Sequence, residues 1–550
     1  MTESRTGGRI LVDALALHGC DRIFHVPGES FLAVLDALHD TPGIDLVTCR
    51  QEGGVGFMAG ADGVLTGRPG VAFVTRGPGA TNASIGVHVA RQDSVPILLF
   101  IGDVDRGMRD REGFQEVDFL TMFAPLAKLV LRIDDPARIP EYVARAWRTA
   151  TSGRPGPVVI ALPEDMLVEE ASVADRPPLA TLEATLDPTN FADLLGRLRR
   201  AERPVAIVGG AGWNKATGAA FAAFAKDWGI PVAGAFRRQD AIANDTRAWA
   251  GNLGYGPSPK LVDRIKAADL LLVVGARLGE ATTDGYTLVT PDHPGQTIIH
   301  VHPDPAELDR VYRADIAVAT TPFAFAAMLA SAEPPATPHA SGAQAHAEWR
   351  AWSTPAPRDV ALDLGACVMA MRDRLSGHYT IICNGAGNFS GWWHRYWHYG
   401  WPGTQLAPTC GAMGYGVPAA LAAALRDPDK LAVAIAGDGD FLMNGQELAT
   451  AVQHGANLLV ILVDNGGYGT IRMHQEREYP ARISGTALTN PDFAALARAF
   501  GAWAETVTAT DQFAPALDRA LARTGVRLLH LKTDMNVITH GTTIAAMRAR

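Results

Sequence analysis

The sequence predicts an α/β protein built from three doubly wound, parallel-sheet domains. Short apolar runs alternate with helical patterns along the chain, which is typical of parallel strands joined by helices. The chain has 550 residues, too many for a single hydrophobic core. Two proline-bearing, linker-like stretches, 176–189 and 331–347, interrupt the alternation. We therefore expect domains at 1–175, 190–335 and 355–550.

The first block begins with a helix and continues with strands that end in polar or glycine-rich turns. The opening residues, MTESRTGGRILVDALALHG, mix charges with an amphipathic pattern and lack the apolar core of a signal peptide, so helix is the simpler interpretation. A strand is expected at 44–47, and a strand, glycine turn, helix and second strand over 71–102. The last strand of the block is expected to end near Pro163.

The second and third blocks continue the same alternation. The second opens with the strand PVAIVGG at 204–210 and has further apolar runs within 269–280 and 297–305. The third contains a strand, turn, helix and strand at 431–464, in the same order as at 71–102. This likeness predicts two related α/β domains with another between them. The alternative is that any two such units share this order.

Composition and charge exclude several classes of protein. The net charge is −9, and no run of five or more Lys or Arg suggests a nucleic-acid surface. The Ala-rich stretches are broken by charges well short of a membrane span. Five cysteines without C-x-x-C spacing favour buried, reduced thiols over zinc or disulfides. We expect a cytoplasmic protein that binds neither nucleic acid nor a membrane.

Two oxygen-bearing side chains follow two apolar strands of the third block. Asp438 follows LAVAIAG and Asn465 follows LLVILVD, and ligands of parallel sheets sit beyond such strand ends. Mg²⁺ prefers oxygen ligands and bridges phosphates, and Gly437 and Gly439 let the backbone approach closely. The pattern therefore indicates a diphosphate held by Mg²⁺, near the free N–H groups of the next helix. The structural alternative is a helix cap at Asp440 and a tight turn after Asn465.

The spacing of this motif resembles the signature of thiamine-diphosphate-dependent enzymes. Gly-Asp-Gly is followed, 27 residues after Asp438, by Asn465 in an Asn-Gly turn. The resemblance implies that Asp438, Asn465 and the backbone carbonyl of Gly467 bind the metal. Asp464 stands where relatives often have asparagine, which is a minor departure. Further contacts with the cofactor are expected for Asn388, Gly437, Gly439, Asp440 and Tyr468.

Two more motifs carry the same resemblance. The stretch TCRQEGG at 48–54 is similar to the family's R-x-E-x-x-A stretch and places its glutamate at Glu52. The resemblance implies that Glu52 hydrogen-bonds N1′ of the aminopyrimidine, so that the cofactor's imino group can form the C2 ylid. The stretch 411–420 implies that Met413 supports the bent cofactor and that the Gly411 carbonyl accepts from its 4′-amino group. Taken alone, Glu52 would be a surface carboxylate and Met413 a core methionine.

Within this family the chain resembles the acetohydroxyacid (acetolactate) synthase branch over nearly its whole length. The stretches 75–82, 114–116 and 150–158 carry this resemblance. It implies a pyrimidine-binding, a central FAD- or nucleotide-like and a pyrophosphate-binding domain, in that order. It also implies a carboligase or lyase that adds the ylid to the carbonyl of a 2-oxo acid or ketone, with active sites between the subunits of a homodimer or homotetramer. Gln115 matches a synthase glutamine near the thiazolium and is expected to hydrogen-bond an intermediate's oxygen.

Three residues depart from the synthase pattern and leave the exact reaction open. His25 and Glu29 stand where synthases usually have glycines, and an ionisable pair there could move protons at the reacting carbon. His474 occupies the position of a tryptophan that shapes the acceptor pocket in synthases. These residues keep a 2-oxo acid decarboxylase, or a lyase that cleaves a diketone or acyloin, as the alternative function.

The sequence of the middle block leaves open whether the protein binds FAD. PVAIVGGAG at 204–212 and the residues 274–278 resemble the domain that binds FAD in synthases, but many relatives keep this domain without the flavin. Gly-Gly-Ala-Gly is a weak dinucleotide fingerprint. A flavin or nicotinamide oxidoreductase centred on this block is disfavoured because no full G-x-G-x-x-G follows PVAIV.

Overall fold

The structure, a computed structural model, describes residues 3–180, 183–292 and 294–549. It contains two compact units. The first comprises the N-terminal part of the chain, up to residue 181, together with the later segments 414–428 and 442–457. The second contains the remaining residues. Residues 181 and 182 of the predicted linker at 176–189 lie outside the described residues.

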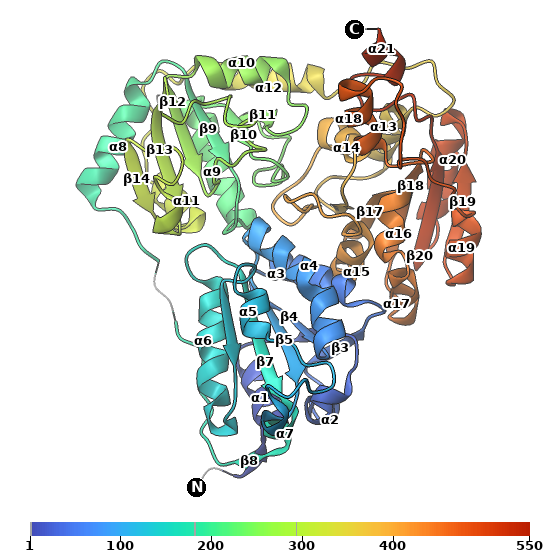
Figure 1. Cartoon of the computed structure of the whole chain (residues 1–550). Coiled ribbons are helices and arrows are strands. Elements are labelled where there is room, and N and C mark those ends of the chain that lie inside the picture. The colour runs from blue at the N-terminus through green and yellow to red at the C-terminus, as the bar shows by residue number, and fades with distance from the viewer. Residues whose placement is uncertain (1–2, 181–182, 293, 550) are drawn as a thin grey trace. The chain divides into compact units, whose positions relative to one another are not determined.

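The first unit is built on a six-stranded parallel sheet with helices on its faces (Figure 1). In spatial order its strands are β3 (Asp45–Thr48), β2 (Arg22–His25), β4 (Gly70–Val74), β5 (Ile97–Asp103), β7 (Pro157–Pro163) and β6 (Leu129–Arg132). Its helices from the N-terminal part of the chain are α1 (Gly7–Leu17), α2 (Leu32–His39), α3 (Glu52–Thr66), α4 (Gly77–Asp93), α5 (Phe119–Phe123), α6 (Ile139–Thr151) and α7 (Glu164–Val168). The short strands β1 (Arg5–Thr6) and β8 (Glu170–Ala171) pair antiparallel beside it.

Two helices from later in the chain complete this unit: α15 (Gly416–Arg426) and α17 (Glu447–Gln453). Arg426, at the end of α15, forms ion pairs with Asp62 at 2.7 Å and with Asp21 at 2.8 Å. Sequence reasoning assigned these helices to the third block because they are continuous with it. In the structure α15 packs against α3, and Arg426 pairs with two aspartates of the first block.

The second unit contains two further six-stranded parallel sheets. In spatial order the central sheet consists of β11 (Trp249–Asn252), β10 (Val232–Gly234), β9 (Pro204–Val208), β12 (Leu270–Val274), β13 (Thr297–His302) and β14 (Ile316–Ala319). Its helices are α8 (Pro188–Arg200), α9 (Lys215–Trp228), α10 (Pro259–Ala267), α11 (Pro322–Leu329) and α12 (Ser341–Trp352).

The sheet of the C-terminal part has its own helices. In spatial order its strands are β16 (Gln405–Leu406), β15 (Thr380–Asn384), β17 (Leu431–Gly437), β18 (Leu458–Asp464), β20 (Val526–Lys532) and β19 (Trp503–Val507). The remaining helices are α13 (Leu364–Arg374), α14 (Ser390–Tyr396), α16 (Asp438–Asn444), α18 (Gly469–Glu478), α19 (Phe493–Ala499), α20 (Thr510–Leu521) and α21 (Ile544–Arg548).

The strand orders explain the internal likeness seen in the sequence. Numbered within each domain, the first and the C-terminal sheets share the order 2-1-3-4-6-5, whereas the central sheet has 3-2-1-4-5-6, the order of dinucleotide-binding folds. The prediction of three doubly wound parallel-sheet domains is confirmed. The residue limits given for these domains stay predictions.

The predicted linker at 331–347 is partly wrong, because α12 begins inside it at Ser341. Pro, Gly and Ser become sparse after this residue, and the buried Ala345 and Trp349 pack into the cores of the central domain. The residues after Ser341 favour a helix and bury a tryptophan, so they fold although the residues before them have the composition of a linker.

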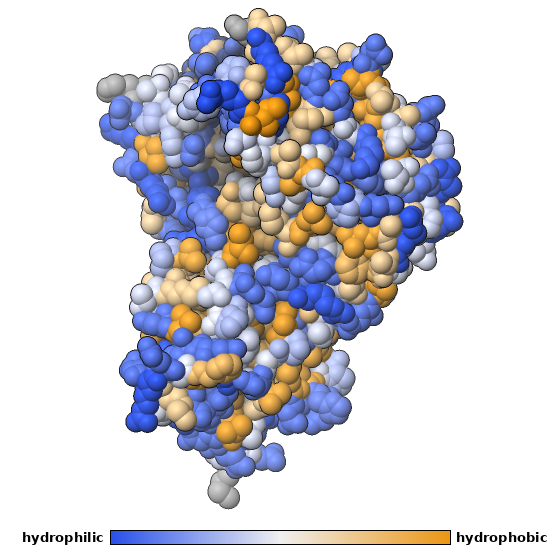
Figure 2. Space-filling view, turned by 45° about the vertical axis from the view of Figure 1, so that its right-hand side comes forward, coloured by the Kyte–Doolittle hydropathy of each residue, from blue (hydrophilic) through white to orange (hydrophobic). Residues whose placement is uncertain are grey.

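The surface mixes hydrophilic and hydrophobic side chains on the face shown in Figure 2. Among the described residues, no helix combines the length and the apolar character needed to cross a membrane. Four of the five cysteines are buried, as the sequence predicted, whereas Cys410 is exposed.

Candidate cofactor and metal site

The carboxyl ends of β17 and β18 bring Asp438 and Asn465 to one edge of the C-terminal sheet. The two strands are parallel neighbours, with Gly437 opposite Val463 in the register. Asp438 is the residue after β17, and Asn465 is the residue after β18. Both strands are apolar and buried over most of their length, and polar residues appear where they end, at Asp464 and Asn465 after β18 and at Asp438 after β17. Because the two strands are neighbours, the residues at their ends lie at the same edge of the sheet.

Asp438 is held by two N–H donors. Its Oδ2 accepts from the backbone N–H of Gly467 at 3.0 Å and from Asn490 Nδ2 at 2.7 Å. The side chain is buried, and burial raises the pKa of Asp438. With Oδ2 engaged in this way, the arrangement leaves Oδ1 as the oxygen for a ligand.

Asp464 lies beside Asp438, and Asn490 bridges the two carboxylates. Asn490 Nδ2 donates to Asp464 Oδ1 at 2.8 Å, and Asp464 Oδ2 accepts from His530 at 2.9 Å and Lys532 at 2.6 Å. Burial raises the pKa of Asp464, but the hydrogen bonds from His530 and Lys532 outweigh it and hold the pKa below its ordinary value. Asp464 therefore stays ionised and anchors the bridge.

The turn that carries Asn465 and Gly467 is fixed by a neighbouring segment. Gly466 has φ +73°, a left-handed conformation that glycine adopts without strain. The N–H of Tyr468 donates to the carbonyl of Thr486 at 2.9 Å, and the N–H of Leu488 donates to the carbonyl of Gly466. Asn465 Oδ1 accepts from the N–H of Gly467 at 3.2 Å. The backbone that presents the Gly467 carbonyl is thus held from both sides.

A cavity of about 210 Å³ opens at this edge of the sheet. Every residue predicted from the sequence to hold the cofactor or the metal lines it. These are Asn388, Gly411, Met413, Gly437, Asp438, Gly439, Asp440, Asn465, Gly467 and Tyr468. The residues come from four separate stretches of the chain, so their convergence is a property of the fold.

The cavity wall fits a magnesium-bound diphosphate. A carboxylate, a carboxamide and a backbone carbonyl form the hard oxygen set that Mg²⁺ prefers. The glycines are required for close packing, because a Cβ on Gly439 would stand 2.5 Å from Tyr468 and one on Gly437 would stand 2.9 Å from Phe389. Within the described residues, no group of three or more His, Cys, Asp or Glu side chains forms a metal site. That finding does not bear on the predicted set, which contains a single carboxylate.

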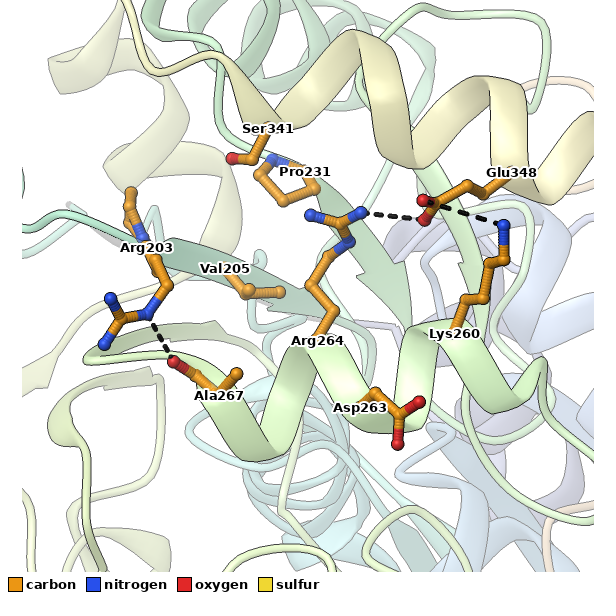
Figure 3. A pocket seen from close by; sticks show the side chains of 10 residues that line it. Arg203, Val205, Pro231, Lys260, Asp263, Arg264, Ala267, Ser341 and Glu348 are labelled. Atoms are coloured by element: carbon orange, nitrogen blue, oxygen red, sulfur yellow. Dashed lines mark hydrogen bonds and ion pairs between the residues drawn. The ribbon is translucent and has the colours of Figure 1, made fainter.

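A larger cavity, of about 350 Å³, lies in the central domain near the beginnings of β9 and β10 (Figure 3). The basic side chains that line it have partners in the cavity wall. Arg264 lies 2.8 Å and Lys260 4.0 Å from Glu348, and Arg203 donates to the carbonyl of Ala267. Its lining includes none of the predicted site residues. We therefore place the candidate site at the smaller cavity, where polar groups converge.

Glu52 lies in the first unit, as the first residue of α3. Its Oε2 accepts from Asn82 Nδ2 of α4 at 2.9 Å. Gln51 caps the helix, and its side chain accepts from the N–H of Gly54 at 3.1 Å. The carboxylate is therefore oriented by one side chain, while a second one fixes the start of the helix.

His25 and Glu29, predicted as an ionisable pair, have different partners. His25 ends β2, is buried, and bonds Thr48 Oγ1 through Nε2 at 3.0 Å. Burial and, to a lesser extent, the charge of His454 lower the pKa of His25 to about 4, so the imidazole is neutral at pH 7. Glu29 is exposed and forms an ion pair with Arg76 at 3.0 Å.

The other two predicted catalytic residues lie on loops or at the surface. Gln115 has φ +64°, and its carbonyl accepts from the N–H of Gly77 at the start of α4, at 2.9 Å. His474 is exposed on α18, and its Nδ1 lies 2.7 Å from Arg477 Nη2. His474 is not among the residues that line the 210 Å³ cavity.

Sequence reasoning missed two side chains that hold the predicted ones. Asn490 bridges Asp438 and Asp464, and Asn82 orients Glu52. Asn82 belongs to the stretch 75–82 that carried the synthase resemblance, so that stretch held a signal for it. Asn490 stands in the loop TNPD, where a turn is the ordinary interpretation.

Replacing Asn490 by alanine should weaken Mg²⁺ binding. The change removes one of the two donors that hold Asp438 Oδ2, and losing a partner of a metal ligand costs about 10–100-fold in metal affinity. The measurement is a calorimetric Mg²⁺ titration in the presence of thiamine diphosphate. The control is Thr533→Val, which removes a hydroxyl bond to the main-chain carbonyl of Asp464 but leaves both carboxylates held. Equal affinities in Asn490→Ala and the unaltered protein would contradict the assignment.

Comparison with known families agrees with this geometry. Models of three domains match in order: the N-terminal thiamine pyrophosphate (TPP) binding domain at 5–122, the central domain at 191–329 and the C-terminal TPP binding domain at 385–531. The chain belongs to the thiamine pyrophosphate enzyme family.

Several acetolactate synthases are similar to this chain. The chain is 32% identical over 519 residues to the acetolactate synthase large subunit of Parasynechococcus marenigrum, covering 90% of this chain and 82% of that protein. It is 30% identical over 533 residues to the acetolactate synthase isozyme 2 large subunit of Escherichia coli, covering 96% and 95%. The predicted family, its acetolactate-synthase-like branch and thiamine diphosphate as the cofactor are confirmed.

Proposed function

We propose that the protein is a thiamine-diphosphate- and Mg²⁺-dependent carboligase or lyase that acts on 2-oxo acids, with pyruvate as its first substrate. One observation carries this proposal: the ten side chains and backbone groups predicted to hold the cofactor and metal line a single cavity. The names of the similar proteins, acetolactate synthases, support the choice of pyruvate.

The chain's own residues would bind the cofactor through its diphosphate. Asp438 Oδ1, the Asn465 carboxamide and the Gly467 carbonyl would hold Mg²⁺, while Gly437 and Gly439 admit the diphosphate close to the backbone. When bound, thiamine diphosphate supplies the carbon nucleophile and the electron sink for cleaving the bond next to a carbonyl. Met413 and Tyr468 line the same cavity and would pack against the cofactor.

Glu52 would hold and exchange a proton at the aminopyrimidine end of the cofactor. A carboxyl group at the start of a helix can serve this role, and Asn82 keeps it in one orientation. Gln115 would donate a hydrogen bond to the oxygen of the bound substrate. His25, neutral and buried, would act as a hydrogen-bonding group rather than as a charged acid.

We propose further that Glu52 of one subunit serves the cavity of a second subunit in a homodimer or homotetramer. Exposed apolar side chains on the first unit, Ile85, Leu442 and Met443, are 42–48% accessible in the single chain and are suited to such an interface. The mass in solution, measured by light scattering, tests this assembly.

Incubation with pyruvate tests the proposed reaction. A carboligase of the synthase type forms acetolactate and CO₂. Acetaldehyde as the product would favour the decarboxylase alternative, and no turnover with pyruvate would favour a lyase that cleaves a diketone or acyloin. The readout is product identification by mass spectrometry, with protein dialysed free of Mg²⁺ as the control.

FAD binding and the cytoplasmic location stay predictions. The central sheet has the strand order of dinucleotide-binding folds, and its β9 and β12 end in glycine turns, with φ +72° at Gly210 and +73° at Gly275. These features support a flavin-binding ancestry for the domain. Flavin absorbance of the purified protein tests whether FAD is bound.

A further inference from the structure

Glu447 is a buried carboxylate that the proposed reaction does not use. It is the first residue of α17 and has no exposed surface. Its Oε1 accepts from the backbone N–H groups of Gln51 at 2.9 Å and Arg50 at 3.0 Å. Its Oε2 accepts from the hydroxyl of Thr450 at 2.5 Å and lies 3.3 Å from the same N–H of Arg50. Burying a carboxylate is costly, and these donors offset that cost.

The two amides belong to the turn that immediately precedes Glu52. Gln51 is the N-cap of α3, and Glu52 is its first residue. The other end of α17 contacts the same turn, because Arg50 Nη2 donates to Gln453 Oε1 at 2.5 Å. The start of the helix is therefore held by a segment almost 400 residues further along the chain.

The two glycines after Glu52 make this contact possible. A Cβ on Gly54 would stand 3.0 Å from Glu447 Oε1, and a Cβ on Gly53 would stand 2.7 Å from Gln51 Oε1. Side chains at these positions would push the Glu447 carboxylate or the capping amide away. The sequence Glu-Gly-Gly thus combines a functional carboxylate with room for the groups that fix its backbone.

We propose that Glu447 is a positioning residue that sets the backbone at Glu52, and through it the carboxyl group that handles the proton of the cofactor. The inference rests on the proposed function for the role of Glu52. Asn82 orients the side chain of Glu52, and Glu447 fixes the peptide groups from which that side chain extends. A displacement of about 1 Å at a reacting group can cost about 100-fold in rate, so control of this backbone matters.

The first test is hydrogen exchange in the full chain without cofactor. Glu447→Gln keeps the shape and one acceptor oxygen but places an NH₂ group against Thr450 and Arg50. The amides of Arg50 and Gln51 should then exchange about tenfold faster, and faster still in Glu447→Ala. The matched control is Asp62→Asn. Asp62 lies on the same helix as Glu52, ten residues further along, and its replacement weakens the ion pair with Arg426. The exchange rates of the Arg50 and Gln51 amides should not change in this control.

The second test separates positioning from general stability. The rate at which the C2 hydrogen of bound thiamine diphosphate exchanges with deuterium is measured in four proteins: unaltered, Glu447→Gln, Glu52→Gln and the double variant. If Glu447 acts through Glu52, C2 exchange is about tenfold slower in Glu447→Gln than in the unaltered protein. The double variant should then be less than about twofold slower than Glu52→Gln alone. Asp62→Asn should lower the unfolding temperature without changing this rate.

Two results would overturn the inference alone. The first is that the Arg50 and Gln51 amides exchange at the same rate in both Glu447 variants as in the unaltered protein. The second is that Glu447→Gln slows C2 exchange by the same factor whether residue 52 is glutamate or glutamine. A C2 exchange rate that Glu52→Gln leaves unchanged would instead remove the proposed role of Glu52, and this inference with it.

Discussion

Replacing Glu52 by glutamine is expected to slow C2 hydrogen exchange of bound thiamine diphosphate by about 10²–10⁴-fold, the usual contribution of a positioned acid or base. The variant has nearly the same size, and its amide oxygen can still accept from Asn82, so α3 should start at the same place. What it loses is the ability to take up and release a proton. The measurement is quenched exchange followed by NMR of the released cofactor.

The control for Glu52 is Glu141→Gln, an exposed carboxylate of the same unit that pairs with Arg138. It should leave the exchange rate within about twofold, because this exposed ion pair contributes little to the fold. Cofactor affinity should be similar in both variants. An exchange rate in Glu52→Gln equal to that of the control would remove Glu52 from the mechanism.

Replacing Asp438 by alanine is expected to weaken thiamine diphosphate binding by about 100-fold or more in the presence of Mg²⁺. The change deletes the only carboxylate among the three predicted metal ligands, and Mg²⁺ binding depends on such charged oxygens. It also removes the acceptor for Asn490 and for the N–H of Gly467, so the turn that presents the second and third ligands loosens. Isothermal calorimetry with and without Mg²⁺ measures the effect.

The matched control for Asp438 is Asp492→Ala. Asp492 caps α19 by accepting from the N–H of Ala495 at 3.0 Å, so its loss should lower the unfolding temperature modestly. Cofactor affinity should not change in this control. A merely structural role for Asp438 predicts that cofactor affinity changes equally little in both variants.

Residues that line the 210 Å³ cavity could be named from the sequence because polar residues directly follow the strands of the sheet. Asp438 and Asn465 directly follow two strands that are largely apolar and buried, and parallel strands end at the same edge of the sheet. The glycine spacing then identified the ligand class. Local pattern and global fold agree at these positions, so the pattern alone was informative.

Side-chain partners from distant segments could not be predicted in the same way. Glu447 begins an ordinary helical pattern, in which an acidic first residue is typical of an exposed helix start, and nothing in the sequence shows that it is buried against the turn before Glu52. The expected pair of His25 and Glu29 rested on their standing where synthases usually have glycines, in one loop after the strand. The fold instead turns His25 toward Thr48 and leaves Glu29 with Arg76, because β2 ends between them.

The most direct test of the central claim is a crystal structure of the protein grown with thiamine diphosphate and Mn²⁺ as an anomalous substitute for Mg²⁺. The account predicts one anomalous peak per chain, in bonding distance of the Asp438 carboxylate, the Asn465 carboxamide and the Gly467 carbonyl, with the diphosphate beside Gly437 and Gly439. A metal peak elsewhere, or cofactor density outside the 210 Å³ cavity, would contradict it.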